Sequence, residues 1–365
     1  MGNDSSKSVS ESDNKQIREQ GFPRLVTVLV GLAAALLALV LMAKYASIIG
    51  PIMMALNLMV TAYPIHTWLT RKGVPAWMAA SVTMLTVYAI LLAMVAGLIW
   101  SVAEMINVLP NYADQWNTLY SQLLSWAGQL GFDSSQLASL LRMVDPNSVI
   151  GAASSVFSGA SGFVGMFVVI VMTIFFMAMD SPGLSGRVKK ISQIRPNTAK
   201  ALTQFARGVR RYWLVTTIFG LIVAVLDGIA LQIMGVPLVM VWVLFSFLTN
   251  YIPNIGFVIG VIPPALVALF ANGWKTAIAV IIAYSVLNFV VQSLIQPRFT
   301  GESVGVTTTI SFLSLLLWSA VLGGLGSLLA LPMTLLAKAL LVDIDPKSRW
   351  AGYLISSKPE ADGVS

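Results

Sequence analysis

The chain has 365 residues, of which 57% are hydrophobic and only 10% are charged, and its formal net charge is +7. Soluble domains carry about 25% charged residues, so this composition excludes a soluble globular protein and predicts an all-α, polytopic helical membrane protein. The basic residues fall in a few short segments, as membrane insertion selects, and we therefore expect no nucleic-acid partner. Cysteine is absent, which excludes disulfides and thiolate metal sites.

The first part of the chain predicts a polar tail followed by three membrane spans. Residues 1–24 are polar and mixed in charge, which is typical of a disordered segment. Residues 25–103 then contain three apolar runs, each long enough to cross a bilayer. These runs are Leu25–Ala43, Ala46–Ile65 and Pro75–Ala103.

Residues 104–150 are less apolar, and their acidic residues outnumber their single basic residue, Arg142. Leucine and tryptophan recur at helical spacing through the first half of this segment, and Gly131 ends that helix before a second one begins. We predict a small amphipathic helical hairpin outside the membrane. Its apolar stripe is expected to pack on the bundle or on a neighbouring subunit.

Charge predicts the orientation of the chain. A fourth span is expected within residues 151–180, and residues 181–212 then contain eight Lys or Arg and no acid. The positive-inside rule places that basic loop in the cytoplasm. Counting back puts the N-terminus there as well, and the basic C-terminal tail, residues 343–365, favours the same side. We expect a multi-pass protein of the inner (plasma) membrane.

Residues 213–342 are predicted to form the transport core. Spans are expected at Trp213–Gly235 and Thr276–Gln296, but Leu238–Ala271 would be roughly 51 Å long as one helix, against a hydrocarbon core of about 30 Å. The segment Val306–Val342 is similarly too long. Both are predicted to be broken or re-entrant helical hairpins, giving about eight membrane segments. Two ordinary tilted spans would also leave the C-terminus in the cytoplasm.

Helix-breaking residues mark the middle of each long segment. The first is interrupted by polar residues and helix breakers, and the second by glycines. These residues are Asn250, Pro253, Asn254 and Gly256 in the first segment and Gly323, Gly324 and Gly326 in the second. Freed backbone groups and half-helix ends at such breaks suit ions or small polar solutes. The alternatives are a simple kink in the first segment and close helix packing in the second.

Asp227 is the only charged residue between Trp213 and Trp274. Placing a carboxylate inside a span costs about 2.5–3.5 kcal/mol on insertion scales, so a proton, a cation, a polar partner or water must offset that cost. The functional interpretation is a group that couples transport to protons or sodium. The alternative is a structural carboxyl that bonds to a neighbouring helix.

Asn288, Gln292 and Gln296 recur at intervals of four, so they share one helix face just before Pro297 and Arg298. Such a polar ladder could line a hydrophilic path, or it could join helices through amide hydrogen bonds. No phosphate-binding loop, metal-ligand spacing or serine–histidine pattern occurs. We therefore expect no cofactor, no metal site and no enzyme activity.

Three sequence blocks resemble the autoinducer-2 exporter family of permeases. They are residues 247–256 (FLTNYIPNIG) with Ile262-Pro263, residues 296–301 (QPRFTG), and residues 323–326 (GGLG) leading to Leu331-Pro332. The resemblance covers most of Leu25–Val342. It implies an oligomeric inner-membrane protein that moves small solutes, with members linked to export of a furanosyl-borate-type signal and to sodium–proton exchange.

The leading hypothesis is therefore a secondary transporter that exports a small polar metabolite or signalling molecule, coupled to an ion gradient. Its expected partners are membrane lipid, the small polar solute, a proton or sodium ion, and further copies of itself. A sodium–proton antiporter is the alternative. A hypothesis from another class is a non-transporting membrane scaffold that uses the external hairpin and the basic loop to recruit partners.

Overall fold

The computed structural model describes residues 24–129, 148, 150–151, 161–252, 256–296 and 306–345. All elements in these residues are helices, which confirms the all-α prediction. The chain divides into two units, residues 1–46 and 47–365. The first contains α2 (Arg24–Lys44), an apolar helix whose side chains are mostly exposed in this structure, as a lipid-facing helix requires.

Six helices in the described residues are long and apolar enough to cross a membrane, and four shorter apolar helices accompany them. The long ones are Ala46–Arg71, Ala76–Gln122, Val164–Ile194, Pro196–Ile233, Trp274–Gln292 and Gly324–Asp343. Large hydrophobic side chains remain exposed along most of them. Outward-facing apolar residues in this number are expected where lipid, not water, surrounds the protein. The polytopic membrane prediction is thereby confirmed.

The early spans form one packed cluster. It joins α3 (Ala46–Arg71), α4 (Ala76–Val108) and α8 (Ser161–Asp180) through buried Ala55, Val87 and Ile174. The Tyr88 hydroxyl of α4 donates to the Val171 carbonyl of α8 at 2.6 Å.

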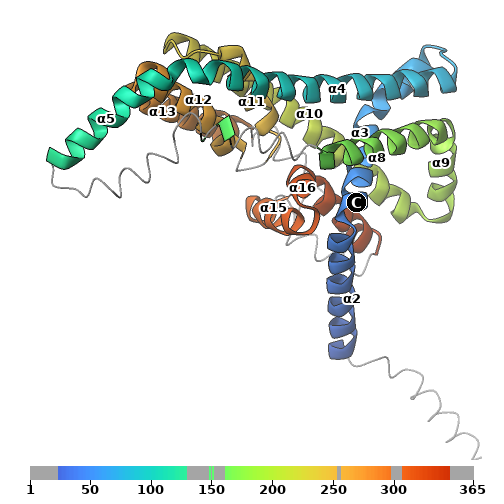
Figure 1. Ribbon diagram of the computed structural model, residues 1–365. Helices are drawn as coiled ribbons and strands as arrows, with labels where there is room; N and C mark the ends of the chain where they lie inside the picture. Colours follow the sequence, from blue (N-terminus) through green and yellow to red (C-terminus); the bar gives the residue numbers. More distant parts are fainter. Residues whose placement is uncertain are drawn as a thin grey trace, which may run out of the picture. The chain divides into compact units, whose positions relative to one another are not determined.

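The segment predicted to lie outside the membrane begins as a helix. After η1 (Leu109–Tyr112), α5 (Ala113–Gln129) extends from the end of α4 and bends away from its line (Figure 1). Trp116 is buried and packs edge-on against Phe270, with ring centroids 5.2 Å apart. Trp116 and the partly buried Tyr120 of α5 thus join a hydrophobic cluster of the bundle. The second helix predicted for the external hairpin lies outside the described residues.

The basic segment is helical where we expected a loop. After η2 (Ser181–Gly183), α9 (Leu184–Ile194) carries three of the basic residues, and α10 (Pro196–Ile233) carries four more in its first half. Proline suits the first position of a helix, and the Ala, Leu, Gln and Arg residues that follow have high helix propensity. The span expected at Trp213 is therefore the second half of a longer helix.

The first overlong segment folds as a hairpin. It consists of α11 (Val239–Thr249) and α12 (Gly256–Asn272), and a Cβ on Gly260 would lie 2.8 Å from the Thr249 hydroxyl, so the two helices touch closely. The Asn272 amide donates to the Gly235 carbonyl at 3.4 Å, which closes the open end of the hairpin. The chain therefore turns back on itself near Asn250. The next helix, α13 (Trp274–Asn288), continues as a π-helix, η3 (Phe289–Ile295).

The second overlong segment is also a hairpin. It comprises α15 (Thr308–Leu322) and α16 (Gly324–Lys338), followed by the π-helical η4 (Ala339–Asp343), and the two α-helices lie side by side (Figure 1). The Trp318 indole donates to Thr334, whose hydroxyl donates to Ser314 at 2.7 Å. Both predicted hairpins are thus present.

The long helix α10 carries both hairpins. A Cβ on Gly220 would lie 3.4 Å from that of Asn250, and Gly228 packs against Val243, so the first hairpin lies on the C-terminal half of α10. The second packs on the other half, where a Cβ on Gly208 would lie 3.2 Å from Leu335. Small residues allow this close approach between membrane helices.

The turn of the second hairpin supplies a test of the fold. A Cβ on Gly326 would overlap the Trp318 carbonyl oxygen, whereas a Cβ on Gly324 would meet nothing within 4 Å. We expect Gly326→Ala to lower the free energy of unfolding by about 1–3 kcal/mol, the usual cost of overpacking, as measured by thermal denaturation in detergent. Gly324→Ala is the control and should change it by less than about 0.5 kcal/mol. Equal effects of the two substitutions would contradict the close packing of α15 on α16.

Candidate functional site

Three predicted amides form a hydrogen-bonded chain, which we call the amide chain: Asn250, Asn288 and Gln292. The Gln292 Nε2 atom donates to Asn250 Oδ1 and to Asn288 Oδ1, each at 3.0 Å. Asn250 Nδ2 also faces the Gly220 carbonyl at 3.5 Å, and Asn288 Nδ2 donates to the Tyr284 carbonyl at 2.8 Å. The amide chain therefore links the turn of the first hairpin to α10 and α13.

The local backbone explains why these side chains can meet. Asn250 caps the C-terminus of α11, where the helix stops. Gln292 lies inside the π-helical η3, and π-helical turns inside α-helices are frequent at functional sites. From this position Gln292 reaches both Asn288, four residues earlier on the same helix, and Asn250 at the end of α11.

Aromatic contacts fix the hairpin turn against α10. Tyr251 is buried, its hydroxyl shares a 2.9 Å hydrogen bond with Thr217, and its ring lies 5.7 Å from that of Trp213. Gly220, which faces Asn250, precedes the C-terminal end of α10 by thirteen residues. At about 1.5 Å per residue the turn lies roughly 20 Å from that end. Lipid could not satisfy the open backbone at such a depth, so protein or a polar path must surround it.

Asp227 is fully buried in the same half of α10, with no exposed surface. The Ser246 hydroxyl of α11 donates to its Oδ2 atom at 2.7 Å. Among the described residues, no group bonds to its Oδ1 atom, and the hydroxyl of Tyr284 is also buried without a partner. Tyr284 is only 1% exposed and packs in the hydrophobic cluster that contains Leu231 and Trp242.

The remaining predicted site residues are distributed over both hairpins. Gly256 begins α12 and packs against the Thr249 carbonyl, beside the amide chain. Gly323 and Gly324 form the turn of the other hairpin, where Gly326 packs on Trp318, so these three glycines belong to a separate turn. Gln296 follows η3 and has a polar interaction of its own. The other four lie outside the described residues: Pro253, Asn254, Pro297 and Arg298.

Sequence reasoning missed Ser246, Tyr284 and the Thr217–Tyr251 pair. Ser246 lies in an apolar helix and Tyr284 precedes the first amide of the ladder by four residues. That spacing was the available signal for Tyr284, because residues four apart share a helix face. Nothing in the sequence identifies Ser246 as the partner of Asp227.

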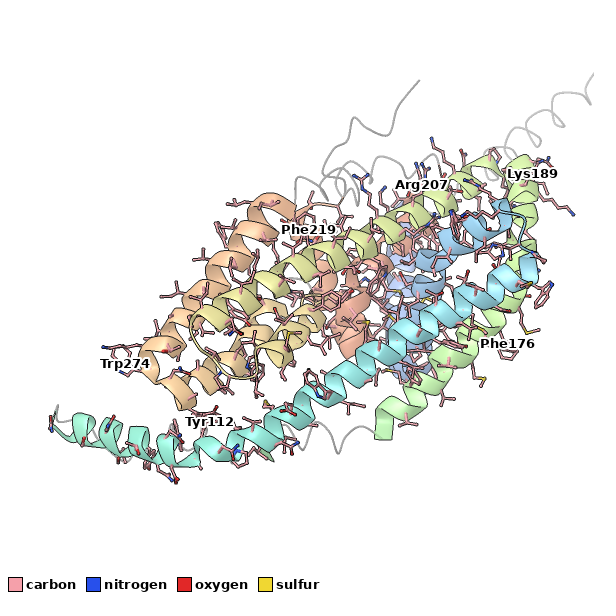
Figure 2. The ribbon with its side chains drawn as sticks, turned by 90° about the horizontal axis from the view of Figure 1, so that it is seen from above. Tyr112, Phe176, Lys189, Arg207, Phe219 and Trp274 are labelled. Carbon is pink, nitrogen blue, oxygen red and sulfur yellow. The ribbon has the colours of Figure 1, made fainter. Side chains whose placement is uncertain are left out.

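Two basic and two aromatic residues lie toward opposite ends of the second unit. Figure 2 shows Lys189 and Arg207 toward one end, with Tyr112 and Trp274 toward the other. Phe219 lies between them on α10, near the level of the hairpin turn. No group of three His, Cys, Asp or Glu side chains in the described part of the chain could hold a metal ion.

These features define a class: a polytopic helical membrane protein with broken helices and a buried polar site between them, the arrangement of secondary transporters. The chain belongs to the AI-2E family of transporters, whose model matches residues 25–344. It is therefore a membrane transporter, and the resemblance read from the three sequence blocks is confirmed.

Named relatives extend over most of the chain. The "Putative transport protein YhhT" of Escherichia coli (strain K12) is 29% identical over 92% of this chain and 93% of its own length. The "AI-2 transport protein TqsA" of the same strain is 30% identical over 80% of this chain and 85% of its own. A "Putative transport protein" of Haemophilus influenzae is 29% identical over 89% of this chain and 95% of its own length.

Proposed function

We propose that this protein is a secondary transporter that exports a small polar metabolite or signalling molecule across the inner membrane, using an ion gradient. The amide chain is the observation that supports this proposal. It places three neutral donor–acceptor side chains at the turn of a helical hairpin, roughly 20 Å from the end of α10. Amides offer both donors and acceptors, which matches a solute rich in hydroxyl and carbonyl groups.

The relative named as an AI-2 transport protein supports a solute of the same chemical class as autoinducer-2. Such a molecule is small, polar and rich in hydroxyl groups. It could exchange hydrogen bonds with Asn250, Asn288 and Gln292 without carrying a charge into the site. The positive-inside rule favours a cytoplasmic position for the basic end of the second unit, which carries Lys189 and Arg207.

The test is solute flux in proteoliposomes made with purified full-length protein and an autoinducer-2-type solute. Gln292→Leu removes the donor that joins Asn250 to Asn288 and leaves two amide oxygens unpaired. We expect flux to fall about tenfold or more, since a buried acceptor left unpaired costs about 1–3 kcal/mol. Ser285→Ala, on an exposed position of the same helix, is the control and should transport normally.

Two results would contradict the proposal. One is normal flux through Gln292→Leu in protein that is correctly folded by size-exclusion chromatography. The other is no protein-dependent flux of any polar solute, tested against an unbiased set of cell metabolites.

A second candidate function is sodium–proton antiport, favoured by the buried Asp227 with its unpartnered Oδ1 atom. In this case a sodium gradient alone would drive proton movement across solute-free proteoliposomes. Absence of any sodium-driven proton movement, in vesicles that do transport a polar solute, would eliminate it.

A further inference from the structure

The helix α9 carries an exposed face that combines two cations with a large apolar side chain. Arg187, Lys190 and Ile194 follow one another at intervals of three and four, so they lie on one side of the helix. All three are exposed, and Ile194 has 79% of its surface open. Such a face suits a surface that offers negative charge and hydrocarbon together.

The cations of this face have no acidic partner in the described part of the chain. Residues 181–212 contain no Asp or Glu. Asp180, at the end of α8, is the nearest acid along the chain, and no ion pair joins it to Arg187 or Lys190 in the described residues. The positive charge is therefore available to an anion outside the chain.

The helix α9 begins where a membrane span ends. The preceding helix α8 has 20 residues and is roughly 30 Å long, which matches the hydrocarbon core of a bilayer. Leu184 follows its last residue, Asp180, by only four positions. The first residues of α9 are therefore expected at the level of the lipid headgroups.

Exposed tryptophans mark the same end of the bundle. Figure 2 shows Lys189 toward the end opposite Tyr112, and Tyr112 follows the last residues of α4. Lys189 thus lies toward the beginning of α4, which carries Trp77, and η2 packs on that helix. Trp77 and Trp68, near the end of α3, are both more than half exposed. Tryptophan is enriched at membrane–water interfaces, so this end reaches the membrane surface.

The opposite side of α9 has a different character. Lys189 lies about 100° from Lys190 around the helix. Its neighbours three and four positions further on are Ser192 and Gln193, which are polar and exposed. Lys189 therefore has the same charge as Lys190 but no exposed apolar residue beside it. This difference allows the face to be tested separately from net charge.

We propose that Arg187, Lys190 and Ile194 form a binding surface for anionic phospholipids, which we call the α9 lipid face. The two cations bind the phosphate oxygens, Arg187 with its planar fork of donors and Lys190 as a compact charge. Ile194 enters the boundary between headgroups and acyl chains, as apolar residues of basic amphipathic helices do. A free phosphate ion would satisfy the cations and leave Ile194 in water. This binding does not depend on the solute or on the coupling ion.

Mass spectrometry of the intact full-length protein, released from detergent micelles, tests the α9 lipid face. Phosphatidylglycerol is titrated and compared with phosphatidylcholine of the same acyl chains, and we expect the anionic lipid to bind more tightly. Arg187→Gln and Lys190→Gln should each weaken its binding about fivefold, the usual effect of one basic residue at an anionic surface. Ile194→Ser should weaken it about tenfold, because an apolar side chain no longer leaves water.

Lys189→Gln is the matched control, since it removes the same charge from the neighbouring position. It should change phosphatidylglycerol binding by less than about twofold, as exposed substitutions usually do. These positions are all exposed, and size-exclusion chromatography checks that the variants fold. Equal losses in Lys189→Gln and Lys190→Gln would show a response to net charge alone and would overturn the proposal.

Two further measurements identify the occupant. Glycerol 3-phosphate carries the anionic phosphate without acyl chains and should not displace phosphatidylglycerol at equal concentration; displacement would show a free-anion site and overturn the proposal. Ile194→Cys is the single cysteine in an otherwise cysteine-free chain. Oxidation in native membranes should leave it unlinked, and a disulfide-linked dimer would place a second copy on this face instead of lipid.

Discussion

A disulfide between Gly220→Cys and Asn250→Cys should form readily and should stop transport. A Cβ on Gly220 would lie 3.4 Å from the Asn250 Cβ atom, close to the separation of about 3.5–4.5 Å found in disulfides. The bond would fix the turn of the first hairpin to α10. We expect flux to fall more than tenfold on oxidation and to recover in part on reduction. The reason is that a turn that opens and closes the path of the solute has to move during transport.

The native chain contains no cysteine, so the cross-link can be measured without background by its resistance to a thiol-reactive mass tag. The two single-cysteine proteins are the controls, and they also report the loss of the Asn250 side chain by itself. A double variant that forms the disulfide and transports equally well in both redox states would show that the turn does not move during transport.

The second large effect is expected at the first residue of α12. Gly256→Val would place a Cβ over the carbonyl oxygen of Thr249, a backbone atom that cannot move aside without opening the hairpin. We expect a loss of about 3 kcal/mol in the free energy of unfolding, measured by thermal or denaturant unfolding in detergent, together with loss of solute flux.

Gly165→Val on α8 is the matched control for this substitution, because a Cβ there meets nothing within 4 Å. It should fold and transport like the parent protein. If Gly256→Val retained both stability and flux, the close approach of α12 to the end of α11 would be wrong.

The sequence was sufficient to predict the elements that depend on length and composition. Both hairpins follow from apolar segments that are too long for one span and carry breakers at their middle, and Asp227 stands out because its neighbours along the chain are uncharged. The Asn288–Gln292 spacing also predicts a shared helix face, and the structure joins these side chains by a hydrogen bond. Local periodicity and hydropathy determine each of these features.

What the sequence could not supply is the pairing between distant segments. Ser246 bonds to Asp227, and Asn250 bonds to Gln292 across the bundle. Hydroxyl and amide residues are common in membrane helices, so the sequence offers several possible partners for each of them. The actual partner depends on which half of α10 each hairpin covers. The helical form of the basic segment was missed for a related reason, since its charge indicated orientation whereas helix propensity determined its structure.

The length of α10 has a mechanical consequence. A helix from Pro196 to Ile233 is roughly 57 Å long at about 1.5 Å per residue, nearly twice the thickness of a hydrocarbon core of about 30 Å. One hairpin contacts it at Gly208 and the other at Gly220 and Gly228. A continuous helix behaves as a stiff rod, so a tilt that loosens the contact with one hairpin also displaces the surface on which the other hairpin packs. A rigid-body tilt of α10 would therefore move the contact surfaces of both hairpins together.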